Sequence, residues 1–338
     1  MNYSVDPAQL FGAGRSLLSG RNAAGVVNFD ERQFQRLIIA NRSVVPEAVV
    51  LGSSRHMQID ASFFPSSSFF NHSVTGGVLQ DYLAIYQMMD EKDSRPKEIF
   101  LGLDPWLLNK HHAQTRWKTL QHEYEAMAAK LGMAIRPKNE SYFNSFGTGR
   151  LRELFSWAYF KESLAEWVIR RGKAKRENFY ATDESWLDVP IKMADGALHY
   201  EKEKGRRSPI ELRKIAADYV KQKPVYSLGN FFEIDKNLSA ILESFMGRLK
   251  QTGVKVTVVL TPYHPGVWRV LAESPDYRMV AAAEGFYGGI AAKQGVAVIG
   301  SFDPARCGCG EEEFFDGMHP KESCLRKIFS PLRSLHHA

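Results

Sequence analysis

Two short segments far apart in the chain contain the residue types that proteins use for nucleophilic acyl transfer. In the first, Gly52-Ser53-Ser54-Arg55 follows an apolar run, so the Ser54 hydroxyl lies at a sharp turn between a strand and a helix. A nucleophile is exposed at such a turn, and the backbone N–H groups after it can face a developing oxyanion. The alternative is that Ser53 and Ser54 only cap a helix, a position that serine favours.

The second segment, FFDGMHP at residues 314–320, places Asp316 and His319 three positions apart in one loop. An aspartate so close can hold the imidazole and stabilise its charged form, while the other ring nitrogen faces a serine. Either segment alone is weak evidence. Together they predict a triad of Ser54, His319 and Asp316.

The elements that must position these residues are short apolar runs at residues 48–51, 98–103, 254–261 and 296–299. Such runs predict buried parallel strands, and helical periodicity at about 78–89 and 234–249 separates them. The alternation predicts an α/β fold with a doubly wound, mainly parallel sheet. Sites in such sheets lie at the carboxyl ends of strands, which Ser54, Asp104 and His264 follow. His264 therefore either touches substrate, serves as a second base or packs in the core.

A stretch of roughly 145 residues after Asp104 is too long for one crossover connection. We expect residues 46–108 and 252–338 to form the core, residues 1–45 a lead-in segment, and residues 109–251 a helical insertion. Helices are expected at 117–131, 151–171 and about 209–221. The insertion either covers the substrate or packs on itself.

The chain of 338 residues has 44 Lys and Arg against 38 Asp and Glu, a formal net charge of +6. Basic residues cluster at 170–176, 202–207 and 213–214, where they face either solvent, an anionic polymer or a lipid surface. No nucleic-acid-binding module is recognisable, so nucleic acid is not an expected partner.

Three cysteines leave several possibilities open. Cys307 and Cys309 lie in a glycine-rich loop near the predicted triad, without the second pair that a structural zinc site normally has. A disulfide involving Cys324 and free thiols are the alternatives. We expect no metal and no cofactor.

No apolar run is long enough for a membrane helix, and Met1 is followed by polar residues rather than by the apolar segment of a signal peptide. This abrupt start is typical of a domain cut just after a membrane anchor.

The motifs resemble, in order, the four blocks of the SGNH (GDSL-like) hydrolase superfamily, whose fold is a flavodoxin-like three-layer sandwich. Gly52-Ser53-Ser54-Arg55 is similar to the first block, with Ser54 as nucleophile and Ser53 in place of its aspartate. Gly76 or Gly77 matches the second block, whose glycine N–H helps to form the oxyanion hole. Asp316 and His319 match the last block, Asp-x-x-His.

Gly102-Leu103-Asp104 resembles the third block, Gly-x-Asn, but departs from it at Asp104. The asparagine of the family donates its amide to the oxyanion, and a carboxylate donates only when it is protonated. Asp104 is therefore protonated, orients another donor such as Arg55, marks a weak or inactive site, or caps a helix ahead of Pro105. Arg55 itself either pairs with Asp104, binds an anionic substrate group, or forms a surface salt bridge.

More narrowly, the opening residues 2–7, the Ser54 turn and the segment 102–106 resemble bacterial SGNH-like proteins of cell-surface polysaccharide acylation. The resemblance implies an extracytoplasmic, periplasmic or cell-envelope domain tethered by an N-terminal membrane helix. It implies a serine esterase or acyltransferase that acts on an acylated glycan, and it makes a membrane acyl-transfer protein a candidate partner. A non-catalytic glycan-binding or assembly subunit is the alternative.

Overall fold

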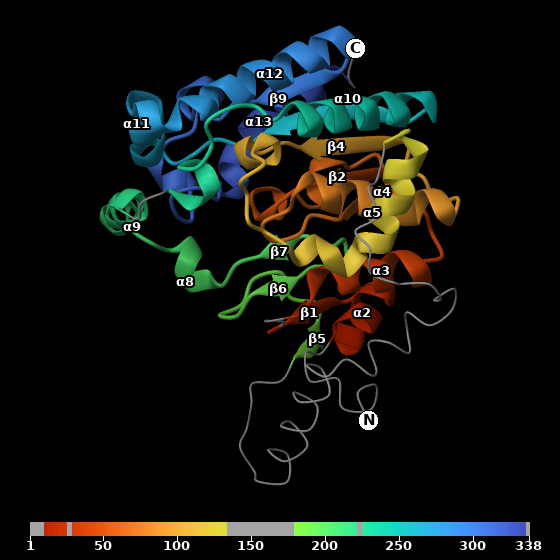
Figure 1. The fold of residues 1–338 in the computed structure, drawn as a ribbon. Coiled ribbons are helices and arrows are strands. Elements are labelled where there is room, and N and C mark those ends of the chain that lie inside the picture. Colours follow the sequence, from red (N-terminus) through yellow and green to blue (C-terminus); the bar gives the residue numbers. More distant parts are fainter. Residues whose placement is uncertain (1–9, 26–28, 134–178, 222–224, 336–338) are drawn as a thin grey trace, which may run out of the picture.

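The computed structural model describes residues 10–25, 29–133, 179–221 and 225–335, and these residues form two β-sheets. The larger sheet has the strand order β3-β2-β4-β8-β9, and every neighbouring pair is parallel (Figure 1). Its strands are β2 (Ala48–Leu51), β3 (Phe69–Asn71), β4 (Glu98–Gly102), β8 (Lys255–Leu260) and β9 (Ala297–Gly300). The predicted mixed α/β class with a parallel sheet is confirmed.

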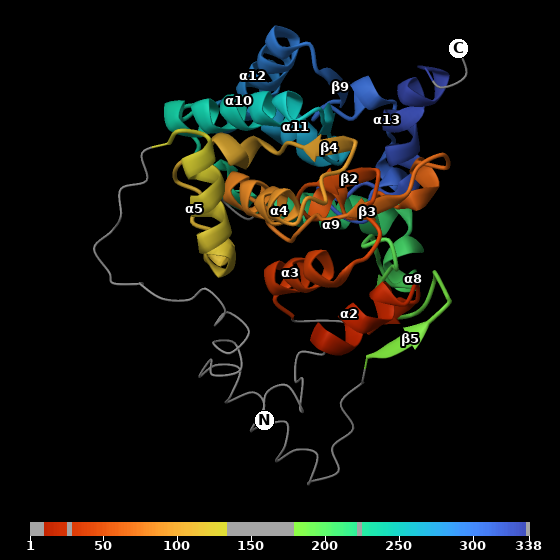
Figure 2. The same cartoon turned by 90° about the vertical axis from the view of Figure 1, so that its right-hand side faces the viewer.

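Helices cover both faces of this sheet. Successive strand residues point to opposite faces and therefore belong to two separate hydrophobic clusters. Val49 and Leu51 of β2 belong to a cluster with residues of α4 (Leu79–Glu91), α10 (Lys236–Gln251) and α12 (Arg278–Gln294). Ala48 and Val50 face the opposite cluster, which contains residues of α13 (Glu322–Leu335). In the view of Figure 2, α4 and α13 flank strands β2 and β3 on opposite sides.

The smaller sheet is antiparallel, with the strand order β5-β1-β6-β7. It combines β1 (Asn22–Ala24), from the predicted lead-in segment, with β5 (Tyr180–Thr182), β6 (Ile191–Lys192) and β7 (Leu198–His199), from the predicted insertion. Helices α2 (Leu10–Leu18) and α3 (Glu31–Asn41) pack beside it in one cluster with Phe70 of β3. The lead-in segment and the insertion are therefore partners in one substructure.

The predicted insertion, residues 109–251, differs from the expectation in two ways. It contains strands β5, β6 and β7 besides helices α5 (Gln121–Lys130), α8 (Lys202–Gly205) and α9 (Pro209–Lys221), so it is not purely helical. Its last helix, α10, packs on the larger sheet and belongs to the core. The helix predicted at 151–171 lies outside the described residues.

Two backbone hydrogen bonds join the small sheet to the large one beside the Ser54 turn. Asn71 N–H of β3 donates to Asp195 O at 2.7 Å, and Leu198 N–H of β7 donates to Met57 O at 2.8 Å. The small sheet is therefore fixed next to the segment that follows β2.

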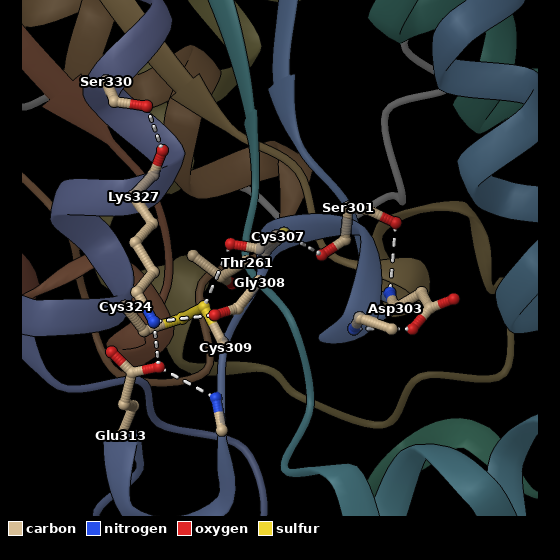
Figure 3. Close-up of a disulfide and its surroundings, with 12 residues drawn as sticks. Thr261, Ser301, Asp303, Cys307, Gly308, Cys309, Glu313, Cys324, Lys327 and Ser330 are labelled. Atoms are coloured by element: carbon tan, nitrogen blue, oxygen red, sulfur yellow. Dashed lines mark hydrogen bonds and ion pairs between the residues drawn. A yellow bond between two sulfur atoms is a disulfide. The ribbon is translucent and has the colours of Figure 1, made fainter.

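A disulfide between Cys309 and Cys324 ties the glycine-rich loop after β9 to α13 (Figure 3). Lys327 of α13 supports the same loop, because its ammonium donates to Gly308 O at 2.7 Å and to Glu313 at 2.6 Å. Cys307 has a free thiol. Of the alternatives left open by the sequence, the structure shows the disulfide that involves Cys324.

In the parts of the chain that the structure describes, no helix is long and apolar enough to cross a membrane. Nor does any group of three or more His, Cys, Asp or Glu side chains there have the arrangement of a metal site.

Replacing Cys309 and Cys324 together by alanine is expected to lower the free energy of unfolding by about 3 kcal/mol. The bridge closes a loop with a sequence separation of 15 residues, and a cross-link restricts the unfolded chain. Urea unfolding of the double variant measures the loss, with Cys307→Ala as the control. Equal stability of the wild-type protein with and without a reductant would contradict the expectation.

Candidate active site

Ser53, not Ser54, is the helix-capping serine at the end of β2. The Ser53 hydroxyl accepts the N–H of Arg55 at 3.2 Å, at the start of a 3₁₀ turn, Ser54–His56. This leaves the Ser54 hydroxyl free to bond elsewhere, and it lies 3.0 Å from Nε2 of His319. The capping alternative therefore applies to Ser53 alone.

His319 is held from its other side by Asp316. Nδ1 of His319 lies 2.9 Å and 2.8 Å from the two carboxylate oxygens of Asp316. Oδ1 of Asp316 also accepts the N–H groups of Met318 and His319, at 2.9 and 3.0 Å. Burial acts to raise the pKa of Asp316, but the imidazole and these hydrogen bonds outweigh it and lower the pKa to about 2. Asp316 is therefore ionised at neutral pH.

The loop that carries this pair is closed on itself. Phe315 N–H donates to His319 O at 2.9 Å, and Phe314 and Pro320 form an isolated antiparallel bridge. The structure thus brings Ser54, His319 and Asp316 into one hydrogen-bonded chain across a sequence separation of 265 residues.

Arg55 lies beneath this chain, fully buried. Its Nη1 donates to Asp104 at 2.9 Å, its Nε to Met318 O at 3.1 Å, and its Nη2 to Thr261 O. The guanidinium also stacks on the Tyr263 ring, 4.0 Å from the centroid. Because every nitrogen of the side chain is occupied, Arg55 pairs with Asp104 and is not available to an anionic substrate.

Asp104 consequently acts as an acceptor for Arg55. Its Oδ1 accepts from Arg55, and its Oδ2 has no hydrogen-bond partner among the described residues. Nδ1 of His56 is 4.0 Å from Oδ2, but burial lowers the pKa of His56 to about 4, so this histidine is neutral at pH 7 and is not a counter-ion. Asp104 also precedes a 3₁₀ turn that begins at Pro105, yet its side chain caps no N–H there.

The position of the His56 ring explains why residues 52 and 102 are glycines. A Cβ atom at Gly52 would lie 2.8 Å from this ring, and one at Gly102 would lie 2.5 Å from it. The ring therefore lies between the ends of β2 and β4, where only glycine leaves room for it.

The two candidate oxyanion glycines differ in what their N–H groups do. Gly77 N–H donates to Val74 O at 3.0 Å, so it is occupied by a turn, whereas Gly76 N–H and Ser54 N–H bond to no group in the described parts of the chain. Val74 N–H donates to Gly52 O at 3.0 Å, which holds this turn against the nucleophile segment. Gly76 has a φ of +57°, a conformation that glycine adopts without strain. Gly76 is therefore the candidate donor and Gly77 the supporting residue.

The start of α3 fixes Thr75, the residue before Gly76. Arg32 donates to Thr75 O at 3.1 Å, and Glu31 accepts both the Thr75 N–H and, at 2.8 Å, its hydroxyl. Arg32 is itself held by a buried bidentate pair with Asp81, at 3.0 and 2.9 Å. A helix from the predicted lead-in segment thus positions the candidate oxyanion turn.

His264 lies apart from the hydrogen-bonded chain of the triad and has structural contacts. Its Nδ1 accepts the N–H of Gly266 at 3.0 Å and caps α11 (Pro265–Glu273), and its own N–H donates to Gly317 O at 3.1 Å. Its ring packs edge-on against Phe314, with the centroids 5.6 Å apart. His264 is fully buried, so of the sequence alternatives its contacts agree with core packing.

Sequence reasoning missed Tyr200, whose ring stands edge-on to His319 at a centroid distance of 6.1 Å. Tyr200 follows β7 of the small sheet, which no pattern in the sequence predicted. Its contact with Phe315, at 4.8 Å between centroids, holds the ring against the loop of Asp316 and His319.

The fold and this arrangement define the chain as a parallel α/β protein with a contiguous Ser-His-Asp group at the carboxyl ends of its strands. Residues 30–332 match the family model described as Protein of unknown function (DUF1574), so the chain belongs to this family. No curated protein matches the chain.

Asp104→Asn, which recreates the Gly-x-Asn block, is expected to destabilise the protein rather than to improve the site. The change leaves the buried Arg55 charge without its carboxylate, and breaking a buried pair costs about 3 kcal/mol or more. Urea unfolding measures the loss against Asp276→Asn, an exposed control. An Asp104→Asn protein of unchanged stability and faster ester hydrolysis would show that the expectation is wrong.

Proposed function

We propose that this protein is a serine-dependent O-acyl, principally O-acetyl, esterase or O-acyltransferase of the SGNH type that acts on a cell-surface polysaccharide. The observation that carries the proposal is the continuous hydrogen-bonded chain from Ser54 through His319 to Asp316. The four motif blocks, in the order that a doubly wound SGNH fold requires, support it.

In the proposed reaction, Ser54 Oγ attacks the acyl carbon while its proton passes to Nε2 of His319. Asp316 orients the ring and stabilises the imidazolium that forms. The tetrahedral oxyanion accepts hydrogen bonds from Ser54 N–H and Gly76 N–H. Collapse breaks the ester bond, the leaving alkoxide takes the proton from His319, and the acyl group stays on Ser54. Water or a sugar hydroxyl then accepts it by the reverse steps.

The oxyanion in this mechanism has two backbone donors and lacks the side-chain amide of the SGNH pattern. Removal of one such donor typically costs about 10²–10³ in rate, so we expect slower chemistry than in an enzyme with the full set.

The polysaccharide and the extracytoplasmic location are inferred from the resemblance of the motifs. The Cys309–Cys324 disulfide supports the location, because structural disulfides persist mainly in oxidising compartments such as the periplasm. Tethering to a membrane and an acyl-transfer partner in the membrane belong to the same proposal.

The second candidate function is a non-catalytic glycan-binding or assembly subunit with the same fold. The Asp104–Arg55 pair favours it, because it removes the expected amide donor. Labelling with a serine-directed phosphonate separates the candidates, because only an activated serine reacts readily.

Ser54→Ala is expected to lower the hydrolysis of p-nitrophenyl acetate at least about 10³-fold and to abolish phosphonate labelling. The Ser54 side chain bonds only to His319 in the described structure, so the variant should fold normally. Ser66→Ala, at an exposed serine, is the matched control and should keep full activity. Full activity of the Ser54 variant would exclude the proposal.

Asp316→Asn is expected to change the pH dependence of stability. The folded pKa of Asp316, about 2, lies below its usual 3.8, so its ionised form stabilises the folded state above about pH 4. This contribution disappears as the pH falls towards 2. The difference in unfolding free energy between wild type and variant should therefore shrink between pH 5 and pH 2, as measured by urea unfolding. A difference that stays constant over this range would contradict the assignment.

A further inference from the structure

A cavity of about 590 Å³ lies beside the proposed active site, between the small sheet and the start of α3. Two of its lining residues connect it to the reacting groups. Tyr200 contacts the His319 ring, and Thr75 precedes the candidate oxyanion donor Gly76. A substrate at Ser54 therefore has a neighbouring space for its next chemical group.

Lys192 of β6 lines this cavity and is only 4% exposed. In the part of the chain that the structure describes, its ammonium has neither a hydrogen-bond partner nor a carboxylate within 4.0 Å. Burial lowers the pKa of Lys192, and the more distant carboxylates of Glu31 and Asp195 offset this effect only in part. A largely buried cation without an ion-pair partner is costly, and a ligand of opposite charge in the cavity lowers that cost.

Glu31 and Asp30, the two acidic residues that line the cavity, already accept hydrogen bonds from other residues. Glu31 accepts two hydrogen bonds from Thr75 and lies 3.7 Å from Arg32. Asp30 caps α3 and accepts the Thr119 hydroxyl at 3.1 Å. Glu31 and Asp195 favour the charged form of Lys192 from a distance, but neither carboxylate lies within 4.0 Å of its ammonium.

The other cations of the lining show that Lys192 differs from an ordinary surface lysine. Arg32 is neutralised by Asp81, and Lys204 pairs with Glu201 at 3.1 Å. Arg116, which is exposed, has no carboxylate within 4.0 Å among the described residues. Its guanidinium lies over Gly76, where a Cβ atom would be 2.7 Å from Nη2. Two cations that have no carboxylate within 4.0 Å among the described residues thus line one cavity.

We propose that this cavity binds an anionic group of the substrate, a carboxylate or a phosphate, while the neighbouring acylated hydroxyl lies at Ser54. The inference rests on the proposed function and deepens it, because it makes the substrate an anionic glycan. Lys192 holds the anion as a positioning residue and takes no part in bond making.

The test measures binding by titration calorimetry in the Ser54→Ala protein, so that it does not depend on turnover. The probes are trigalacturonate, its methyl ester, glycerol 1-phosphate and glycerol. We expect one of the anions to bind at least about tenfold more tightly than its neutral counterpart, the gain of a charge-assisted hydrogen bond. Preference for trigalacturonate identifies a carboxylate ligand, and preference for glycerol 1-phosphate identifies a phosphate ligand.

Lys192→Met keeps the length and the apolar stem of the side chain and should remove this preference. Lys204→Met, at the paired lysine of the same cavity, is the matched control and should retain it. The hydrolysis of p-nitrophenyl acetate, which carries no anionic group, should change less than twofold when Lys192→Met is made with Ser54 intact. Thermal unfolding of Lys192→Met without ligand should occur at a higher temperature, because a buried unpaired cation has been removed.

Equal binding of the anions and their neutral counterparts, or an equal loss in both lysine variants, would overturn the inference. Its failure is distinguishable from failure of the proposed function. If Ser54→Ala abolishes ester hydrolysis and no anion preference exists, only the anion site is wrong. If the anion preference exists and Ser54→Ala retains full hydrolysis, only the serine mechanism is wrong.

Discussion

The candidate active site depends on one buried contact, the ion pair between Arg55 and Asp104. Arg55 follows β2 and directly follows Ser54, while its guanidinium bonds to residues that follow β4 and β8 and to Met318 of the His319 loop. One side chain thereby fixes the Ser54 turn relative to the loop that carries His319. The planar guanidinium, with its five N–H donors, can satisfy several acceptors at fixed angles, which a lysine cannot do.

The Arg55–Asp104 pair contributes more to the positions of the surrounding residues than to the free energy of folding. Both side chains are fully buried, and the cost of removing two charges from water offsets much of their attraction. The pair also bears on the proposed mechanism, because the carboxylate of Asp104 accepts from Arg55 and the proposed oxyanion donors are backbone N–H groups. In the SGNH pattern the residue at this position serves the reacting group directly. Here it serves the framework that holds Ser54 and His319 together.

Local patterns in the sequence were sufficient to predict the parts of the site that lie on regular strands and in one loop. Apolar runs located β2, β4, β8 and β9, and the spacing of Asp316 and His319 indicated their contact. The strand β3 escaped prediction because it has only three residues, Phe69–Asn71, too few to show a period. The partners of Arg55 were not predictable in full, because two of the three are backbone carbonyls, which any residue provides.

The small sheet escaped prediction for a different reason. Its strands have two or three residues each and pair across long separations, as in β1 with β5, where Asn22 lies opposite Thr182. Only tertiary pairing makes them strands, since isolated segments of that length have no stability of their own. Yet this sheet places Tyr200 against His319 and Lys192 in the adjacent cavity.

The two sheets have different roles in the candidate site. The large parallel sheet determines where the reacting groups lie, because their positions follow from strand ends and from the Arg55 contacts. The small sheet, assembled from chain segments on either side of β2, β3 and β4, surrounds the space next to them. In the proposed function, substrate selection can therefore change through β6, β7 and the start of α3 without disturbing the contacts that align Ser54 with His319. A shift of the small sheet would, however, reach the oxyanion turn through Glu31 and Arg32, which hold Thr75. Occupation of the cavity and the position of Gly76 are thus physically linked.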